Sequence, residues 1–580
     1  MDAKHVINKL PAIRSRRAAY VSLIILFAVV FFVPYLFPVA HTVSVSYIVG
    51  YNNRVAFVLF AVGSIVFGLL AAKNFPEPEA ADQLLGPYSL VAALVITVLS
   101  CTVRLVPIAN HRVGSEGAYF LNRAQMLASG LRPYIDFEYA YGPSHLYIPV
   151  FFAHLVHCSV VRGYYAWWSL QWLLGTVMLW TAIRLIDLPV PRRRIYFWLL
   201  FLLQLCQIRD EGAVYTPIRS IGAAFFVVVV VSLWNRAHRP MATVLAALLC
   251  VSIAFAISPE QGVALFVGLL GWFILLTSQR SSSFPHWAAV LFAGGGAILT
   301  ITCWRFGEFK TLLEFSSGAY AFPLLPSPAN IIILISYVAA ACIGVKYLLA
   351  RRFNSVVVPL FLVGYALLPA ALNRCDLGHL MSASPIFLLG IAAIESRPSM
   401  RSLWSPFAIL LVIVPVIAMG FMLLLVDNQT KQSSTQTTTS EPDPAVLSTA
   451  PAPCPVIYRS LNVAPRPNRI NRQDCLDTGY YFLTSIPITE HAIDRMIGEL
   501  NRQPLEPLVL LDQPLAKQFP PREFDVGVLR ILELSLWLPR PRNQPFTYNR
   551  LIEAIERNYT PNPTPVGGLR IWQPKSALSP

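Results

Sequence analysis

The sequence predicts a mainly α-helical protein, a polytopic bundle of transmembrane helices followed by a small α/β domain. Three observations predict this fold class. The 580-residue chain is 55% hydrophobic and only 13% charged, whereas an ordinary soluble domain is about 25% charged. Apolar stretches of roughly 20 residues, the length that spans a bilayer, recur from Tyr20 to Val426. After Val426 the composition changes to a polar, Ser/Thr/Pro-rich sequence.

These changes divide the chain into three parts. Residues 1–426 form the predicted transmembrane domain, 427–453 an extended linker rich in Ser, Thr and Pro, and 454–580 a soluble domain. Within the last part we predict a buried strand in "PLVLLD" and a final strand in "GGLRIWQP". We predict a helix in "YNRLIEAIERNY", because its apolar residues recur with helical periodicity.

Thirteen spans are predicted. The first is a retained span, because its apolar run is longer than the 7–15 residues of a signal-peptide core and no convincing small-residue cleavage site follows it. The spans cover about 20–40, 55–72, 87–108, 164–186, 194–208, 218–235, 241–257, 260–278, 286–304, 327–350, 354–372, 380–395 and 403–426.

One further apolar run, 145–161, is assigned to an interfacial helix. If it does not span, the basic clusters at 192–194, 236–239, 346–352 and 397–401 all fall on the cytoplasmic side, as the positive-inside rule requires. Its two internal histidines and early proline also suit an interfacial helix. This topology predicts a cytoplasmic N-terminus, an extracytoplasmic C-terminal domain and insertion in the cell (inner) membrane.

The net charge of +15 is attributed to these topology signals. Lys and Arg cluster in short connections between apolar runs, and no basic stripe is interleaved with stacking aromatic residues on a soluble part. Nucleic acid is therefore excluded as a partner.

The polar segment 114–143, "GSEGAYFLNRAQMLASGLRPYIDFEYAYGP", contains the main functional signal. Apolar and polar residues segregate on two faces between Phe120 and Ser129, which predicts an amphipathic helix on the membrane surface. Ser115 is the predicted N-cap and Gly130 the C-terminal stop. Glu116 then lies in the first turn, where it either favours the helix start or serves catalysis.

An acidic residue framed by interfacial helices suits a membrane glycosyltransferase. The phosphate of a lipid-linked donor lies at headgroup height, and the acceptor arrives from outside. A carboxylate there can deprotonate an acceptor hydroxyl, and nearby arginines can hold the phosphate leaving group.

The same segment resembles the first extracytoplasmic loop of the GT-C glycosyltransferases, a superfamily that includes protein O-mannosyltransferases and lipid A aminoarabinose transferases. The family pattern is Asp-Glu-Gly-x-Tyr, a helix, Gly-x-x-Pro-Tyr-x-Asp-Phe and then Gly-Pro. The sequence departs from it at the leading Asp, where Ser115 stands. It matches at Glu116, Gly117, Tyr119, Gly130, Pro133, Tyr134, Asp136, Phe137, Gly142 and Pro143.

The resemblance implies transfer of a sugar from a polyprenyl-phosphate donor to an extracytoplasmic acceptor, with inversion at the anomeric carbon. It assigns neither a cofactor nor a metal. The implied catalytic residues are Glu116, Asp136 and Asp210, with Glu116 first in place of the missing Asp. The implied substrate-binding residues are Tyr119, Tyr134, Glu211, Arg374, Asp376 and His379, and the residues themselves add Arg123 and Arg219 as cations.

Several of these residues have a structural alternative. Asp210 and Glu211 would also solvate the end of a span, and Arg219 would also snorkel to the interface. Arg374, Asp376 and His379 would also form a salt-bridged loop. Glu260, in "SPEQG", is interpreted as the tip of a tight hairpin, and "GYYAWWSLQW" at 163–172 as an aromatic belt.

Two rival functions stay open. A transporter or flippase would place ionisable groups at mid-membrane depth and often shows repeated halves. A catalytically inactive GT-C-like assembly partner is suggested by Ser115 in place of the family's Asp.

Overall fold

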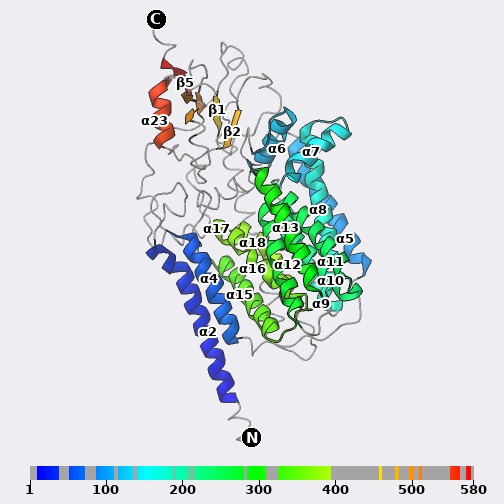
Figure 1. Ribbon diagram of the computed structural model, residues 1–580. Helices are drawn as coiled ribbons and strands as arrows, with labels where there is room; N and C mark the ends of the chain where they lie inside the picture. Colours follow the sequence, from blue (N-terminus) through cyan, green and yellow to red (C-terminus); the bar gives the residue numbers. More distant parts are fainter. Residues whose placement is uncertain are drawn as a thin grey trace.

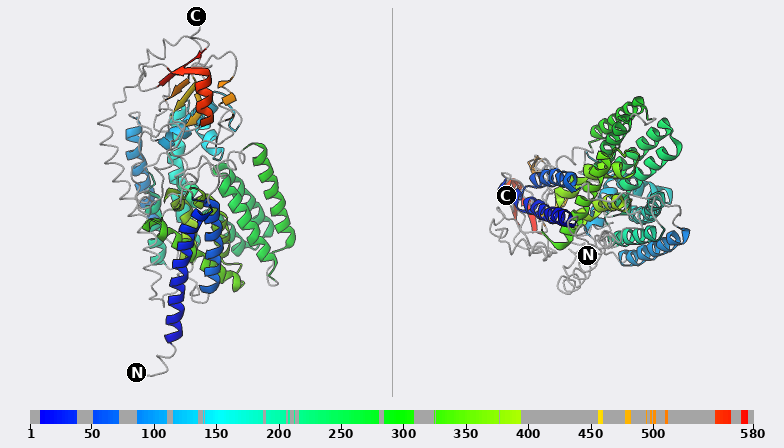
Figure 2. Two further views of the ribbon diagram at one scale, coloured as in Figure 1. Left: turned by 90° about the vertical axis from the view of Figure 1, so that its left-hand side faces the viewer. Right: turned by 90° about the horizontal axis from the view of Figure 1, so that it is seen from below.

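The computed structural model is a helical bundle with a small β-sheet at one end (Figure 1). It describes residues 9–37, 51–71, 86–109, 115–134, 139, 141–186, 190–205, 207–208, 212, 216–279, 284–307, 324, 326–375, 377–393, 456–459, 477–481, 494, 497–498, 500–501, 509–511, 549–561 and 570–575. The N-terminal helix projects past the bundle at the end away from the sheet (Figures 1 and 2).

The described helices follow the predicted apolar runs closely. They are α2 (Lys9–Phe32) with the 3-10 turn η1 (Val33–Leu36), α4 (Asn53–Ala71), α5 (Pro87–Ala109), α6 (Ser115–Ala128), α7 (Ser144–Leu155), α8 (Val160–Leu185), α9 (Val190–Leu205), α10 (Pro217–Ala237), α11 (Pro240–Ile257), α12 (Pro259–Thr277), α13 (His286–Arg305), α15 (Pro328–Leu349), α16 (Val357–Ala366), α17 (Leu368–Arg374) and α18 (Leu377–Ala392).

Six of these helices are long and apolar enough to cross a membrane. They are α4, α10, α11, α12, α13 and α15, and the pair α7 and α8 adds a seventh if it counts as one broken span. Shorter apolar helices cover the predicted spans near 20–40, 87–108, 354–372 and 380–395. The predicted span at 403–426 and the linker at 427–453 lie outside the described residues.

The predicted span at 354–372 is divided in two. Helix α16 ends at Ala366 and α17 begins at Leu368. Pro369 has no N–H to donate to the preceding turn and its ring crowds the carbonyl four residues earlier. The chain therefore restarts as a separate short helix.

The run at 145–161 does not continue straight into the next span. Helices α7 and α8 meet at 117° across a break of four residues or fewer. The chain turns at His157, which has a positive φ of 49°, and Ser159 caps α8 by accepting a hydrogen bond from the Arg162 N–H at 3.4 Å. The bend separates this run from the next span, and its interfacial placement stays a prediction.

Burial separates central from peripheral helices. In α10 and α15, 72% of the span residues are buried, against 22% in α13 and 28% in α4. Large apolar side chains such as Leu70 and Ile298 stay exposed on the peripheral helices, which is expected where lipid replaces protein as the neighbour.

The α10–α11, α12–α13 and α15–α16 connections meet at one end of the bundle, called the basic end here. The Asn235 side-chain amide donates to the Asn354 carbonyl at 3.1 Å, and Gln279 donates to the Arg351 carbonyl at 2.6 Å. The Trp272 indole donates to the Phe353 carbonyl at 2.7 Å. The exposed cations Arg236, Arg239, Arg351 and Arg352 gather there.

A five-stranded sheet follows in the C-terminal part. Strands β1 (Val456–Arg459), β2 (Asp477–Tyr481), β3 (Val509–Leu511), β4 (Tyr559–Pro561) and β5 (Arg570–Pro574) lie in the order β2-β1-β3-β5-β4, with helix α23 (Asn549–Asn558) before β4. The pairs β1–β2 and β1–β3 are parallel, and β3–β5 and β4–β5 are antiparallel. Strand β2 lies next to α6 (Figure 1). The predicted strand in "PLVLLD" corresponds to β3, the predicted helix to α23 and the predicted final strand to β5.

Candidate functional site

The candidate site lies at the bundle end opposite the basic end, called the site end here. Helix α6 begins at Ser115, which is its first helical residue and not the predicted N-cap, and Glu116 lies in its first turn, as predicted. It ends through Gly130, whose φ of 93° opens the left-handed region. The Leu131 N–H then donates to the Met126 carbonyl at 3.1 Å, which closes the helix in the manner of a Schellman motif.

An aromatic cluster joins α6 to the loop before α7. The ring of Phe120 lies 6.3 Å from Tyr139 and 5.0 Å from Tyr141, and Tyr119 stacks on Tyr139 at 6.3 Å between centroids. Phe120 and Tyr139 are fully buried. Edge-to-face and offset pairs of this kind fix ring positions, so Phe120, Tyr139 and Tyr141 hold one another in place.

Tyr134 closes this loop on itself. Its hydroxyl donates to the Tyr141 carbonyl at 2.9 Å, and its ring centroid lies 6.0 Å from that of Tyr139. Tyr134 has a φ of 66°, a left-handed conformation that costs a non-glycine residue free energy. The contacts around it therefore hold the backbone in this turn.

Arg123 is the cation of the cluster. Its guanidinium carbon lies 4.6 Å from the Tyr119 ring centroid, and the residue is only 2% exposed. A buried guanidinium over an aromatic face gains a cation–π interaction. Two predicted substrate-binding residues, Tyr119 and Arg123, are thus in contact.

Burial raises the pKa of Tyr139 well above its ordinary value, and the neighbouring tyrosines reinforce this. A phenol in such surroundings stays neutral, because the charged form is poorly solvated. Its hydroxyl has no hydrogen-bond partner among the described residues. It remains a neutral donor and acceptor inside the cluster.

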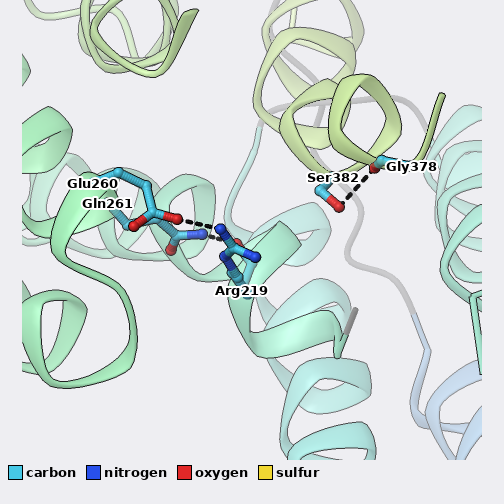
Figure 3. Close-up of polar contacts among 5 residues, drawn as sticks. All are labelled: Arg219, Glu260, Gln261, Gly378 and Ser382. Atoms are coloured by element: carbon cyan, nitrogen blue, oxygen red, sulfur yellow. Dashed lines mark hydrogen bonds and ion pairs between the residues drawn. The ribbon is translucent and has the colours of Figure 1, made fainter. Parts of the chain in front are cut away.

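A largely buried ion pair lies at the starts of helices α10 and α12. The Arg219 guanidinium, two residues after the first residue of α10, pairs with the Glu260 carboxylate in the first turn of α12 (Figure 3). Their side chains are only 13% and 15% exposed. The Gln261 side-chain amide donates to the Arg219 carbonyl.

The ion pair contacts the aromatic cluster. The Arg219 guanidinium carbon lies 5.3 Å from the Tyr141 ring centroid. Directly after Tyr141, the Gly142 N–H donates to the Ile257 carbonyl at 3.2 Å. A Cβ at Gly142 would lie 2.3 Å from the Ala256 carbonyl oxygen. The end of the loop is therefore seated against the last turn of α11.

A buried histidine completes this junction. His145, in the first turn of α7, is fully buried, and the Trp167 indole of α8 donates to its Nδ1 at 3.4 Å. The imidazole lies within electrostatic range of Arg219 and Glu260. Five elements, namely α7, α8, α10, α11 and α12, thus converge where the loop ends.

Helix α18 contacts α10 beside the ion pair. Gly378 and Ser382, linked by a 2.9 Å hydrogen bond from the serine hydroxyl, lie across from Arg219 in Figure 3. The predicted residue His379 lies in this same turn and is half-buried. Arg374 is the last residue of α17, so its backbone is at the same end.

The structure thus brings four predicted site residues together, namely Tyr119, Arg123, Tyr134 and, through Tyr141, Arg219. Asp136, Asp210, Glu211 and Asp376 lie outside the described residues, as do the side chains of Glu116 and Arg374. Among the residues described, no group of three His, Cys, Asp or Glu side chains is placed to hold a metal ion.

Glu260 and Gln261 were missed as site residues. Glu260 does lie at a tight hairpin tip, with only Ser258 between α11 and α12, but it also pairs with Arg219. A signal was present in the sequence: in "TPIR" and in "SPEQ" a helix begins at the Pro, and the predicted topology puts both starts on the same side.

The prediction of an aromatic belt at 163–172 is wrong. Tyr164, Trp168 and Trp172 are 2% exposed or less, and Tyr165 and Trp167 are 7% exposed. The reason is the position of α8, which contacts α5, α6, α7 and α10, so that protein covers the rings that a belt would present to lipid headgroups.

No protein-family model, curated protein or solved structure matches the chain.

Proposed function

We propose that the protein is an integral membrane glycosyltransferase. It transfers a sugar from a polyprenyl-phosphate carrier to an acceptor outside the cytoplasm, without a nucleotide. One observation carries the proposal. The segment between α6 and α7 has the GT-C-like sequence, and its last aromatic residue, Tyr141, contacts the largely buried Arg219–Glu260 pair at the bundle end opposite the basic end.

The proposed reaction is a single displacement. The acceptor oxygen attacks the anomeric carbon, its proton passes to a carboxylate, and the bond from that carbon to the phosphate oxygen breaks to leave polyprenyl phosphate. Glu116 is the first candidate for the base, and Asp136 and Asp210 are the alternatives. A positioned carboxylate contributes typically 10²–10⁴-fold to such a step.

The cations have different proposed roles. Glu260 already compensates the charge of Arg219, so a phosphate would have to displace a buried carboxylate in order to reach it. We assign Arg219 to holding Tyr141 and the helix junction. Arg374, at the end of α17, is the proposed phosphate contact, because guanidinium binds phosphate oxygens in bidentate fashion.

The proposed topology places the basic end in the cytoplasm and the site end outside. It includes thirteen spans in the cell membrane and an extracytoplasmic domain at 454–580. In this arrangement the loop lies at headgroup height, where the carrier phosphate and an external acceptor meet.

The position of the ion pair favours an enzyme over a transporter. Transporters place their working charges near the bilayer midplane, whereas Arg219 and Glu260 lie in the first turns of α10 and α12. Charges at helix starts on one side suit chemistry at an interface.

The test is transfer of radiolabelled sugar from polyprenyl-phosphate donors by the purified protein in lipid nanodiscs. Glu116→Gln is expected to lower transfer by about 10²-fold or more. The matched control is Glu553→Gln, which changes an exposed carboxylate on α23 and should leave transfer unchanged. Flipping of labelled lipid without transfer would point to a flippase, and neither activity with any donor would favour the assembly partner.

A further inference from the structure

The end of the short helix α17 is hydrogen-bonded by a side chain from α4. The last four carbonyls of a helix lack partners within it, and α17 has only seven residues. The side-chain amide of Asn53, the first residue of α4, donates to the Leu372 carbonyl at 2.9 Å and to the Cys375 Sγ at 3.4 Å. In the sequence these two partners stand on either side of Arg374, the last residue of α17. The backbone around Arg374 is therefore tied to the start of α4.

Cys375 turns the chain directly after Arg374. Its φ of 49° lies in the left-handed region, which costs a non-glycine residue free energy and persists only where the surroundings hold it. Its N–H donates to the Ala371 carbonyl at 3.3 Å, and its thiol donates to the Leu372 carbonyl. Both Cys375 and Asn53 are buried, at 1% and 2% exposed. Contacts that are shielded from water thus set the direction of the backbone after Arg374.

The neighbouring residue Asn52 has the same side chain but different partners. Its side-chain oxygen caps α4 by accepting from the N–H groups of Arg54 and Val55 at 3.1 and 3.2 Å. Its amide donates to the Phe37 carbonyl at 2.9 Å, just after η1. Within the described part of the chain, Asn53 is thus hydrogen-bonded to the end of α17, whereas Asn52 is bonded to the segment that precedes α4.

We infer that Asn53 is a positioning residue for Arg374. It holds the backbone from which the Arg374 side chain extends, so that the guanidinium is preorganised to bind the phosphate of the lipid-linked donor. A binding group that is held in one geometry loses less conformational entropy when its ligand arrives, which increases affinity. The inference rests on the proposed function and deepens it, because it names a residue that tunes donor affinity through Arg374.

The experiment compares Asn53→Ser with Asn52→Ser in the purified full-length protein. Each substitution shortens one amide side chain at the start of α4 and removes its donation to a backbone carbonyl, and serine still caps a helix at position 52. Arg374→Ala and the double variant Asn53→Ser/Arg374→Ala complete a double-mutant cycle, which measures whether the two residues act together. Binding of polyprenyl phosphate is measured by native mass spectrometry, together with the melting temperature.

Arg374→Ala is expected to weaken binding of polyprenyl phosphate by about tenfold or more, the loss of a charged hydrogen bond. Asn53→Ser should weaken it by about threefold to tenfold, and Asn52→Ser should leave it unchanged. The double variant should bind no more weakly than Arg374→Ala, because Asn53 then has no guanidinium left to position. The two serine variants should have similar melting temperatures, which separates positioning from a general loss of stability.

A second variant covers the case in which Asn53→Ser does not fold. Glycine adopts the left-handed conformation without strain, so Cys375→Gly should fold while it removes the sulfur that Asn53 contacts. It should also weaken binding of polyprenyl phosphate, and only where Arg374 is present.

Three outcomes would overturn the inference: equal binding by the two serine variants, additive losses in the double variant, or unchanged binding by Arg374→Ala. The two proposals fail separately. The expected binding pattern without any transfer of radiolabelled sugar would contradict the enzyme alone, whereas transfer with additive losses of binding would contradict the positioning role alone.

Discussion

The two ends of the bundle differ in that only the site end combines exposed arginines with a largely buried ion pair among the described residues. At the basic end, Arg236 and Arg239 are exposed, and the helix connections are joined by side-chain amides that donate to backbone carbonyls. At the site end, Arg132, Arg162 and Arg305 are exposed too, but Arg219 and Glu260 are largely buried and neutralise each other beside Tyr141. Exposed cations cost little and set topology, whereas a buried pair costs solvation and persists only where its geometry is held.

The largest expected contrast between the ends concerns access. On a cysteine-free background, Ser129→Cys at the site end should react with a membrane-impermeant maleimide on intact cells. Arg236→Cys should react only after the membrane is opened, because the basic end is proposed to face the cytoplasm. Both positions are exposed. Labelling of both from the same side would contradict the assigned ends.

Breaking the buried pair should be the largest energetic effect. Glu260→Gln leaves the Arg219 charge uncompensated and should destabilise the fold by about 3 kcal/mol. Arg236→Ala, which removes an exposed cation, should stay within about 0.5 kcal/mol. Chemical unfolding in detergent measures both. The double variant Arg219→Met/Glu260→Leu should recover most of the loss, and a loss that persists in it would show that the pair's charge is not the cause.

A smaller effect is expected where the loop meets α11. Gly142→Ala forces a Cβ against the Ala256 carbonyl and should cost about 1–3 kcal/mol. The control is Gly86→Ala, since Gly86 has open space around it. If the two variants unfold at the same denaturant concentration, the close approach at Gly142 is not a constraint.

The smallest effect concerns one hydroxyl. Tyr134→Phe removes the hydrogen bond to the Tyr141 carbonyl and should cost about 0.5–1.5 kcal/mol. Tyr88→Phe changes a side chain that is 86% exposed and should be neutral. Differential scanning fluorimetry resolves the two, and equal melting temperatures would remove Tyr134 from the loop closure.

Local sequence predicted much of the helical architecture because hydrophobic length and helix-end signals are local properties. The start of α6 at Ser115, its stop near Gly130, and the hairpin at Ser258 follow from such signals. The span that divides at Leu367 was missed, although Pro369 is the physical reason. The residues around Pro369 form a continuous apolar run, and composition alone predicts one unbroken span there.

The loop residues of the candidate site were predicted, but the Arg219–Glu260 ion pair was not. The loop residues Tyr119, Arg123 and Tyr134 stand within 16 positions of one another, so their proximity could be argued from the sequence. Glu260 lies 41 residues after Arg219, and its partner depends on how α10 and α12 pack. The same limit explains the error over Trp168 and Trp172, because lipid-facing and protein-facing aromatic residues have the same composition.

The sequence by itself determined that the chain forms apolar helices, where most of them begin and end, and which polar segment stands out between them. Hydrophobic transfer and helix capping depend on residues that are close together in the sequence, so both can be predicted from the sequence alone. Only the tertiary structure decided that Glu260 neutralises Arg219, that Gly142 is seated on α11 and that the α8 tryptophans face inward. Those outcomes depend on which helix surfaces meet, and that depends on the packing of the whole bundle.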